Sequence, residues 1–218
     1  MNHRTKIFMA VLFVIFMTSI VAAFGGILGG DDLTTQNVLV CPVDDSGACN
    51  VAFLISIENG KISNYTSVST EGMDHPTVAD PNNANEKLSF HDALTLDDKE
   101  QGLNYAKEIY EANNDGVTID GAAAVDSKII TDVIAAAGTL KDGDNVINPT
   151  AADLISPSSL DSVKPICDAL LNAAKDPQQS GAMYNAAFSD YKSGDVTLTP
   201  HGFFAKLAAS YVFGGLFA

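Results

Sequence analysis

The stretch NVLVCPVDDSGACNVAFLISIENGKISNYTSV, residues 37–68, decides the fold. It predicts three consecutive strands, Asn37–Val43, Asn50–Ile57 and Lys61–Val68. The first two are rich in β-branched and other apolar residues, which is typical of strands buried on both faces. The connection Glu58–Lys61 carries an Asn-Gly pair, which favours a tight hairpin because both central positions of a type I′ turn need a positive φ.

The rest of the chain alternates between helical and extended patterns. After a long loop-like segment, the periodicity of apolar residues predicts four helices, two further strands and an apolar tail helix. The expected segments are the loop Ser69–Leu94, a helix from Leu96 capped by Asp97, the strand Val117–Val125, a helix Ser127–Ala137 capped by Asp126, turns over Thr139–Ser159, helices Leu160–Lys175 and Gln178–Lys192, the edge strand Val196–Thr199 and the tail Pro200–Ala218. This order predicts an α/β fold, a three-layer α/β/α sandwich with a mixed sheet.

Residues 7–28 form an almost unbroken apolar run. As a helix it would be about 33 Å long, enough to cross a bilayer. Basic residues precede the run and Asp31 and Asp32 follow it, so the positive-inside rule places the N-terminus in the cytoplasm. A cleaved signal peptide is the alternative, and the length of the run favours a retained anchor. We therefore expect an anchor in residues 1–30 and an extracytoplasmic domain in residues 31–218.

The charge of the chain excludes nucleic acid as a partner. The formal net charge is −15, and the expected domain holds 10 Lys against 27 Asp and Glu. Nucleic-acid affinity depends on Lys and Arg that neutralise phosphates. Arg4 is the only arginine and lies outside the expected domain. A domain without arginine lacks the side chain best suited to bidentate binding of phosphate.

Two long stretches resemble a known family. VLVCPVDDSGACNVAFLISIENGKI and GVTIDGAAAVDSKIITDVIAAAG resemble the extracytoplasmic domain of LytR–CpsA–Psr proteins. A closer resemblance is to an uncharacterised group of membrane-anchored methanogen surface proteins distantly related to that family. The shared patterns are "nGki-nYt" at Asn59–Thr66, "G-HPT" at Gly72–Thr77, "HD-L" at His91–Leu94 and "G-YAKEI" at Gly102–Ile109.

The resemblance implies an anchored α/β/α domain that transfers a polyprenyl-pyrophosphate-linked glycopolymer to the cell envelope. The LytR–CpsA–Psr family uses acidic residues for a divalent metal and several arginines for the pyrophosphate. Asp44 matches its first acidic position, whereas Asn50 replaces the second acid and Ala48 replaces the preceding arginine. The later arginine positions have no match in Ser67–Thr77 or Gln178–Met183. The resemblance therefore predicts the scaffold without the family's catalytic arginines.

The candidate ligand-binding residues are polar groups that follow the first strand or lie in the long loop. They are Asp44, Asp45, Asn50, Asp74, His75, His91 and Asp92. If the loop folds back to the first strand, Asp44, His75 and His91 could bind one divalent metal ion, and this donor set favours a transition metal over calcium. The alternative is that Asp44 closes an Asx-type turn and the histidines only hydrogen-bond the loop.

Two covalent modifications are also predicted. Cys41 and Cys49 flank a short loop and would form a disulfide in an exported domain, or else they are small buried hydrophobic residues. Asn64 begins an Asn-Tyr-Thr glycosylation sequon, usable if its side chain faces solvent.

These observations leave two functional hypotheses. In the first, the membrane-anchored domain binds an envelope glycopolymer or a polyprenyl-linked carrier without chemistry. In the second, the Asp44, His75 and His91 region rebuilds a metal-dependent phosphotransferase or hydrolase. The two hypotheses differ in whether these three side chains meet in one pocket.

Overall fold

The computed structural model describes residues 35–58, 61–173 and 176–204. Its main sheet has five strands in the order β3-β2-β1-β6-β9. The strands are β1 (Gln36–Val43), β2 (Val51–Glu58), β3 (Lys61–Ser69), β6 (Gly121–Asp126) and β9 (Val196–Thr199). β1 runs parallel to β6, and the other neighbours are antiparallel, so the sheet is mixed as predicted.

The opening meander confirms the prediction from residues 37–68. β1 pairs with β2, and β2 pairs with β3 with Glu58 opposite Lys61. The two residues of the predicted Asn-Gly turn lie outside the described residues. Side chains of β1 alternate between the two faces of the sheet, because Val38 belongs to one hydrophobic core and Leu39 to the other. The central strand is therefore buried on both sides.

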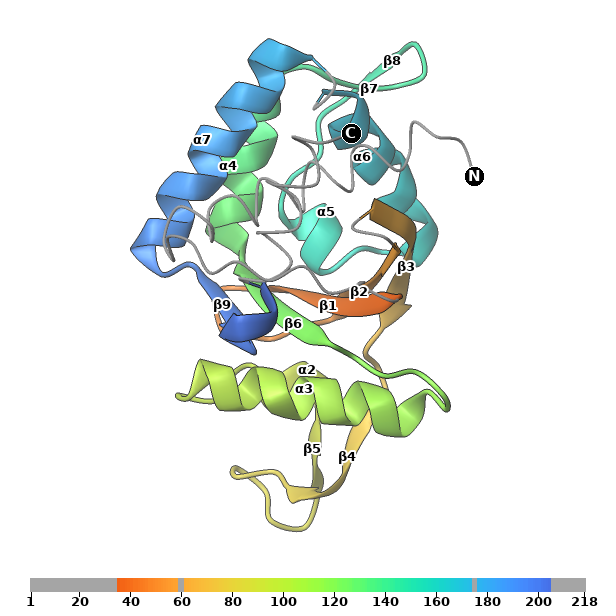
Figure 1. Cartoon of the computed structure of the whole chain (residues 1–218), viewed down its shortest axis with the longest axis vertical. Helices are drawn as coiled ribbons and strands as arrows, with labels where there is room; N and C mark the ends of the chain where they lie inside the picture. The colour runs from red at the N-terminus through yellow and green to blue at the C-terminus, as the bar shows by residue number, and fades with distance from the viewer. Residues whose placement is uncertain (1–34, 59–60, 174–175, 205–218) are drawn as a thin grey trace.

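Helices cover both faces of the sheet and complete three layers (Figure 1). One face carries α2 (Phe90–Ala93) and α3 (Lys99–Asn113). The opposite face carries the larger core and these helices: α4 (Ser127–Ala137), α5 (Ala152–Ile155), α6 (Leu160–Ala173) and α7 (Pro177–Ser193). Lys128 of α4 also pairs with the buried Asp190 of α7. The predicted α/β sandwich is thus present.

The segment Ser69–Leu94 is more ordered than predicted. It contains a hairpin of β4 (Asp74–Ala79) and β5 (Lys87–Ser89), followed by α2. These strands are short and polar, and their register shifts between Asp74 and Ala79, so no alternation of apolar residues marks them in the sequence. In Figure 1 this hairpin lies beyond α3, away from the main sheet.

Other boundaries differ by a few residues. The helix predicted from Leu96 begins at Lys99, because Asp98 rather than Asp97 accepts a hydrogen bond from the Gln101 amide. β6 begins at Gly121, and the turn-rich segment before α6 contains the hairpin of β7 (Leu140–Asp142) and β8 (Asn145–Ile147). The predicted anchor 7–28 and most of the tail helix lie outside the described residues. Within the described part of the chain, no helix is both long and apolar enough to cross a bilayer.

Candidate functional site

The residues between β1 and β2 lie at the edge of the sheet where several strands start or end. β2 is antiparallel to both β1 and β3, so β1 and β3 end where β2 begins. β6 runs parallel to β1 and therefore ends at the same edge. A groove of about 620 Å³ opens beside this edge. The described residues that line it are Asn50, Val51, Ser69, Thr70, Glu71, Gly72, Ser89, His91, Ser156, Pro157, Ser158, Ser159 and Leu160.

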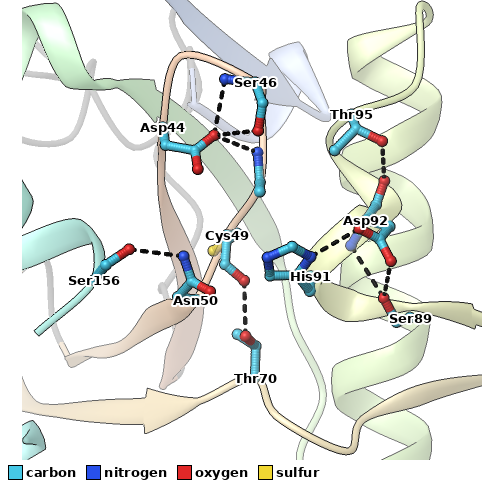
Figure 2. Close-up of polar contacts among 11 residues, drawn as sticks. Asp44, Ser46, Cys49, Asn50, Thr70, Ser89, His91, Asp92, Thr95 and Ser156 are labelled. Atoms are coloured by element: carbon cyan, nitrogen blue, oxygen red, sulfur yellow. Dashed lines mark hydrogen bonds and ion pairs between the residues drawn. The ribbon is translucent and has the colours of Figure 1, made fainter. Parts of the chain in front are cut away.

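Asp44 closes the loop between β1 and β2. Its Oδ1 accepts hydrogen bonds from the Ser46 amide at 2.9 Å, the Ser46 hydroxyl at 2.6 Å and the Ala48 amide at 3.0 Å (Figure 2). Burial by itself would raise the pKa of Asp44, but these hydrogen bonds and the nearby His91 ring outweigh it and lower that pKa. Asp44 is therefore an ionised residue that fixes the loop, as the alternative Asx-turn interpretation predicted.

His91 and Asp92 form a hydrogen-bonded pair on α2. His91 Nδ1 lies 2.7 Å from Asp92 Oδ1, and Asp92 Oδ2 accepts a hydrogen bond from the Ser89 hydroxyl at 2.7 Å. Burial would raise the pKa of Asp92, but the bonds from Ser89 and His91 lower it. The His91 carbonyl also accepts a bond from the Cys49 amide, which joins α2 to the loop after β1. Figure 2 shows the second ring nitrogen of His91 facing that loop, on the side opposite Asp92.

Asn50 joins the sheet to the far wall of the groove. Its Nδ2 donates a hydrogen bond to Ser156 Oγ at 2.8 Å, in the loop between α5 and α6 (Figure 2). On the other side, the Thr70 hydroxyl donates to the Cys49 carbonyl at 2.7 Å. Thr70 is buried, so this bond holds the end of β3 against the loop before β2. The groove is thus built from segments that are far apart in the sequence.

Asp45 contacts the start of α4. Its Oδ1 accepts a hydrogen bond from the Ser127 hydroxyl at 2.6 Å. Burial and the carboxylates of Asp195 and Asp45 raise the pKa of Asp126, against the opposing effect of Lys99. Asp45 therefore binds the start of α4 and does not line the groove.

The structure does not gather Asp44, His75 and His91 into a metal site. His75 lies in β4, is 3% exposed, and contacts α3 through a 2.9 Å bond to Glu108. Its Nδ1 accepts bonds from the Thr77 and Val78 amides, so Nε2 carries the proton that it donates to Glu108. No group of three or more His, Cys, Asp or Glu in the described part of the chain could hold a metal ion. The predicted metal trio is therefore wrong, because the hairpin directs His75 to α3.

Asp74 also lies outside the groove. It is exposed on β4, and its carbonyl accepts a bond from Asn113 Nδ2 at 3.2 Å. Of the seven predicted residues, Asn50 and His91 line the groove. Asp44 and Asp92 do not line it, but Asp44 accepts a bond from the Ala48 amide and Asp92 is bonded to the His91 ring.

The predicted modification sites are compatible with their surroundings. Cys41 and Cys49 are buried free thiols, and a hydrogen bond to Cys49 together with burial raises the pKa of Cys41. The two thiols are in contact, and a disulfide between them remains a prediction for oxidising conditions. Asn64 is exposed on the edge strand β3, which meets the condition for use of the sequon.

Sequence reasoning missed most of the hydroxyl-bearing wall of the groove. The Ser156-Pro157-Ser158-Ser159 run was included only in a turn-rich segment, and Ser69, Thr70 and Glu71 only in the long loop. A serine-rich turn just before a helix is the one local signal that marked the first run. Ser156 lies 106 positions after Asn50, so no local pattern predicts the hydrogen bond between them.

A family model described as a protein of unknown function, DUF4012, matches residues 44–158, which is more than half of the chain. The chain belongs to the DUF4012 family. The DUF4012 match begins at Asp44 and ends at Ser158, so it includes all of the groove lining except Ser159 and Leu160. The comparison with curated proteins finds no match for this DUF4012 chain.

Solved structures similar to this DUF4012 chain are LytR–CpsA–Psr proteins, the family that the sequence resembles. Bacillus subtilis TagV is 12% identical with a TM-score of 0.47, over 84% of this chain and 80% of that chain. Bacillus subtilis yvhJ, described as a transcriptional regulator, is 13% identical with a TM-score of 0.47, over 85% and 78%. TagT bound to LI-WTA is 11% identical with a TM-score of 0.48, over 83% and 78%. Similarity at this level does not extend to ligand or activity.

Proposed function

We propose that this domain is an extracytoplasmic, envelope-associated module whose groove binds a neutral, hydroxyl-rich segment of an envelope glycopolymer. One observation carries the proposal. Six hydroxyl-bearing residues and Asn50 line the groove, together with His91 and Glu71. Of the six hydroxyls, those of Thr70 and Ser89 already donate to Cys49 and Asp92, so the other four, on Ser69, Ser156, Ser158 and Ser159, are the groups proposed to meet a ligand. Hydroxyl and amide groups both donate and accept hydrogen bonds, so they match the alternating donors and acceptors of sugar hydroxyls.

The charges around the groove favour a neutral ligand. The lining formed by the described residues contains neither Lys nor Arg, and Glu71 is its only carboxylate. The whole chain has a formal charge of −15. A phosphate or pyrophosphate would need cationic side chains to offset its charge. Transfer of a pyrophosphate-linked polymer by the chemistry of the LytR–CpsA–Psr family is therefore not proposed for this groove.

The extracytoplasmic location is proposed from the sequence alone. Residues 7–28 are expected to anchor the chain in a membrane, with the acidic domain outside. TagT, a solved structure similar to this chain, is bound to LI-WTA, a wall teichoic acid. A teichoic acid is therefore the polymer with which binding of a neutral glycan is compared.

Isothermal titration tests the proposal. The probes are a neutral N-acetylglucosamine hexamer and a glycerol-phosphate teichoic acid, added to the domain 31–218. We expect saturable binding of the neutral oligosaccharide and weaker binding of the anionic polymer. Ser158→Trp, which fills the groove, should abolish binding, whereas Asn145→Trp on the exposed β7–β8 hairpin should not. Binding that is unchanged in Ser158→Trp would place the ligand elsewhere.

A further inference from the structure

The His91–Asp92 pair has the arrangement of an acid–base dyad. Asp92 is anchored through Oδ2 by the Ser89 hydroxyl, and its amide in turn donates to Ser89 Oγ at 3.2 Å, which leaves Oδ1 for the His91 ring. An ionised carboxylate only accepts hydrogen bonds, so Nδ1 of His91 must be the donor. The neutral ring then has its lone pair on Nε2.

The Nε2 atom of His91 is the ring nitrogen that Asp92 leaves unbonded. His91 lines the groove, and the structure gives Nε2 no hydrogen-bond partner among the described residues. In Figure 2 it lies on the side of the ring opposite Asp92, toward the Asp44–Asn50 loop. A positioned imidazole with a free Nε2 and a carboxylate on Nδ1 can accept a proton from water and return it to a leaving group.

The surrounding side chains restrict the chemistry. Transfer of a phosphoryl group requires cations around the transferred phosphate, and the described lining has none. Hydrolysis of a glycosidic bond ordinarily requires two carboxyl groups flanking the bond, and Glu71 is the single carboxylate of that lining. Hydrolysis of an acyl ester requires a base and neutral hydrogen-bond donors for the developing oxyanion. The Ser156 residue lines the same groove as His91, and its hydroxyl, whose oxygen accepts a bond from Asn50, still has a proton to donate.

The geometry points to an esterase activity in which His91 is the catalytic base and Asp92 the positioning residue, acting on an acyl ester carried by a polyhydroxylated ligand. His91 Nε2 takes a proton from water as the water oxygen bonds to the acyl carbon. The bond between that carbon and the ligand oxygen then breaks, and Nε2 returns the proton to that oxygen. Ester and water thus give one carboxylic acid and one free hydroxyl, with no redox change. The identity of the natural ester rests on the proposed function.

Three chromogenic probes test this inference on the purified full-length chain: 4-nitrophenyl acetate, 4-nitrophenyl phosphate and a 4-nitrophenyl glycoside of N-acetylglucosamine. We expect hydrolysis of the acetate alone. His91→Ala should lower kcat/KM for the acetate by roughly 100-fold, and Asp92→Asn by at least about tenfold. The matched control is His201→Ala, an exposed histidine 3.7 Å from Glu100, which should keep the wild-type rate.

Added imidazole separates a chemical role of His91 from a structural one. Measured above the rate that the same imidazole concentration gives without protein, it should restore part of the acetate hydrolysis of His91→Ala, which a merely misfolded variant would not show. Equal rates for wild type and His91→Ala, or cleavage of only the phosphate or the glycoside, would overturn the inference. Binding of the N-acetylglucosamine hexamer without ester hydrolysis would overturn it too, while leaving the proposed function standing.

Discussion

The Asn50 side chain donates a 2.8 Å hydrogen bond to Ser156, a residue 106 positions later in the chain. This side-chain hydrogen bond joins the start of β2 to the Ser156–Ser159 loop across the groove. Asn50 therefore holds two walls of the groove together.

Breaking this bond should weaken ligand binding more than it weakens the fold. Asn50→Ala and Ser156→Ala should each lower the free energy of unfolding by about 0.5–1.5 kcal/mol, because the bond is exposed. The double variant should cost less than the sum of the two, since both remove the same bond. Urea unfolding measures stability, and titration with the N-acetylglucosamine hexamer measures binding. Strict additivity of the two substitutions would show that the bond does not form in solution.

The Asp44 loop should make stability dependent on acid pH. The pKa of Asp44 is lowered in the fold, so its stabilisation is fully present above the unfolded pKa of about 3.9 and is lost as the pH falls through the lowered folded value. Asp44→Ala should cost about 1–2 kcal/mol at pH 7, where its three hydrogen bonds are intact, and less at pH 3.

A graded variant provides the comparison for Asp44. Ser46→Ala removes the hydroxyl bond and keeps both amide bonds to Asp44. Its pH dependence should lie between those of wild type and Asp44→Ala. Urea unfolding at pH 7 and pH 3 measures all three proteins. If wild type and Asp44→Ala lose the same stability on acidification, Asp44 is not the group responsible.

Two helical glycines should respond to alanine with opposite signs. A Cβ at Gly102 of α3 would lie 2.3 Å from the Ala93 carbonyl of α2, whereas a Cβ at Gly181 of α7 would meet nothing within 4 Å. Gly181→Ala should therefore stabilise by about 0.5–1 kcal/mol through helix propensity. Gly102→Ala should destabilise by about 1–3 kcal/mol and displace α2, which carries His91. Thermal unfolding tests both, and stabilisation by Gly102→Ala would contradict the close packing of α2 on α3.

Oxidation should join Cys41 to Cys49. The two thiols are buried and in contact, so little movement is needed. Treatment with oxidised glutathione during refolding should remove two hydrogen atoms from the protein, detected by intact mass, and should stabilise it by about 2 kcal/mol. Cys167→Ser should still form this disulfide, whereas Cys49→Ser should not. A peptide map that links Cys167 to either partner would contradict the prediction.

Local patterns predicted the sheet and most of the helices, because each pattern is contained within a few consecutive residues. The apolar residues of β1 and β2 and the apolar stripe of α4 are of this kind. The positions of the two loop histidines could not be predicted in the same way. His75 and His91 occur in similar Asp-His contexts, but β4 carries His75 to Glu108, and α2 carries His91 to the Cys49 segment. That difference depends on packing between distant segments.

The groove also depends on packing between distant segments, so local patterns did not predict it. The side-chain chemistry of Asn50 and His91 marks both residues as candidates in the sequence, and both line the groove. Nothing in the sequence marks Ser158 and Thr70, because serine and threonine are frequent in loops and carry no periodic signal. Only the meeting of the β2, β3 and α6 ends gives these hydroxyls a common role.

The most direct test of the account is a map of ligand-induced shifts in the ¹⁵N NMR spectrum of the domain 31–218, titrated with the N-acetylglucosamine hexamer. We expect saturable shifts concentrated at Asn50, Thr70, Glu71, His91 and Ser158, with little change on the β7–β8 hairpin. Saturable shifts confined to another surface, or none at millimolar oligosaccharide, would contradict the claim that this groove is a glycan-binding site.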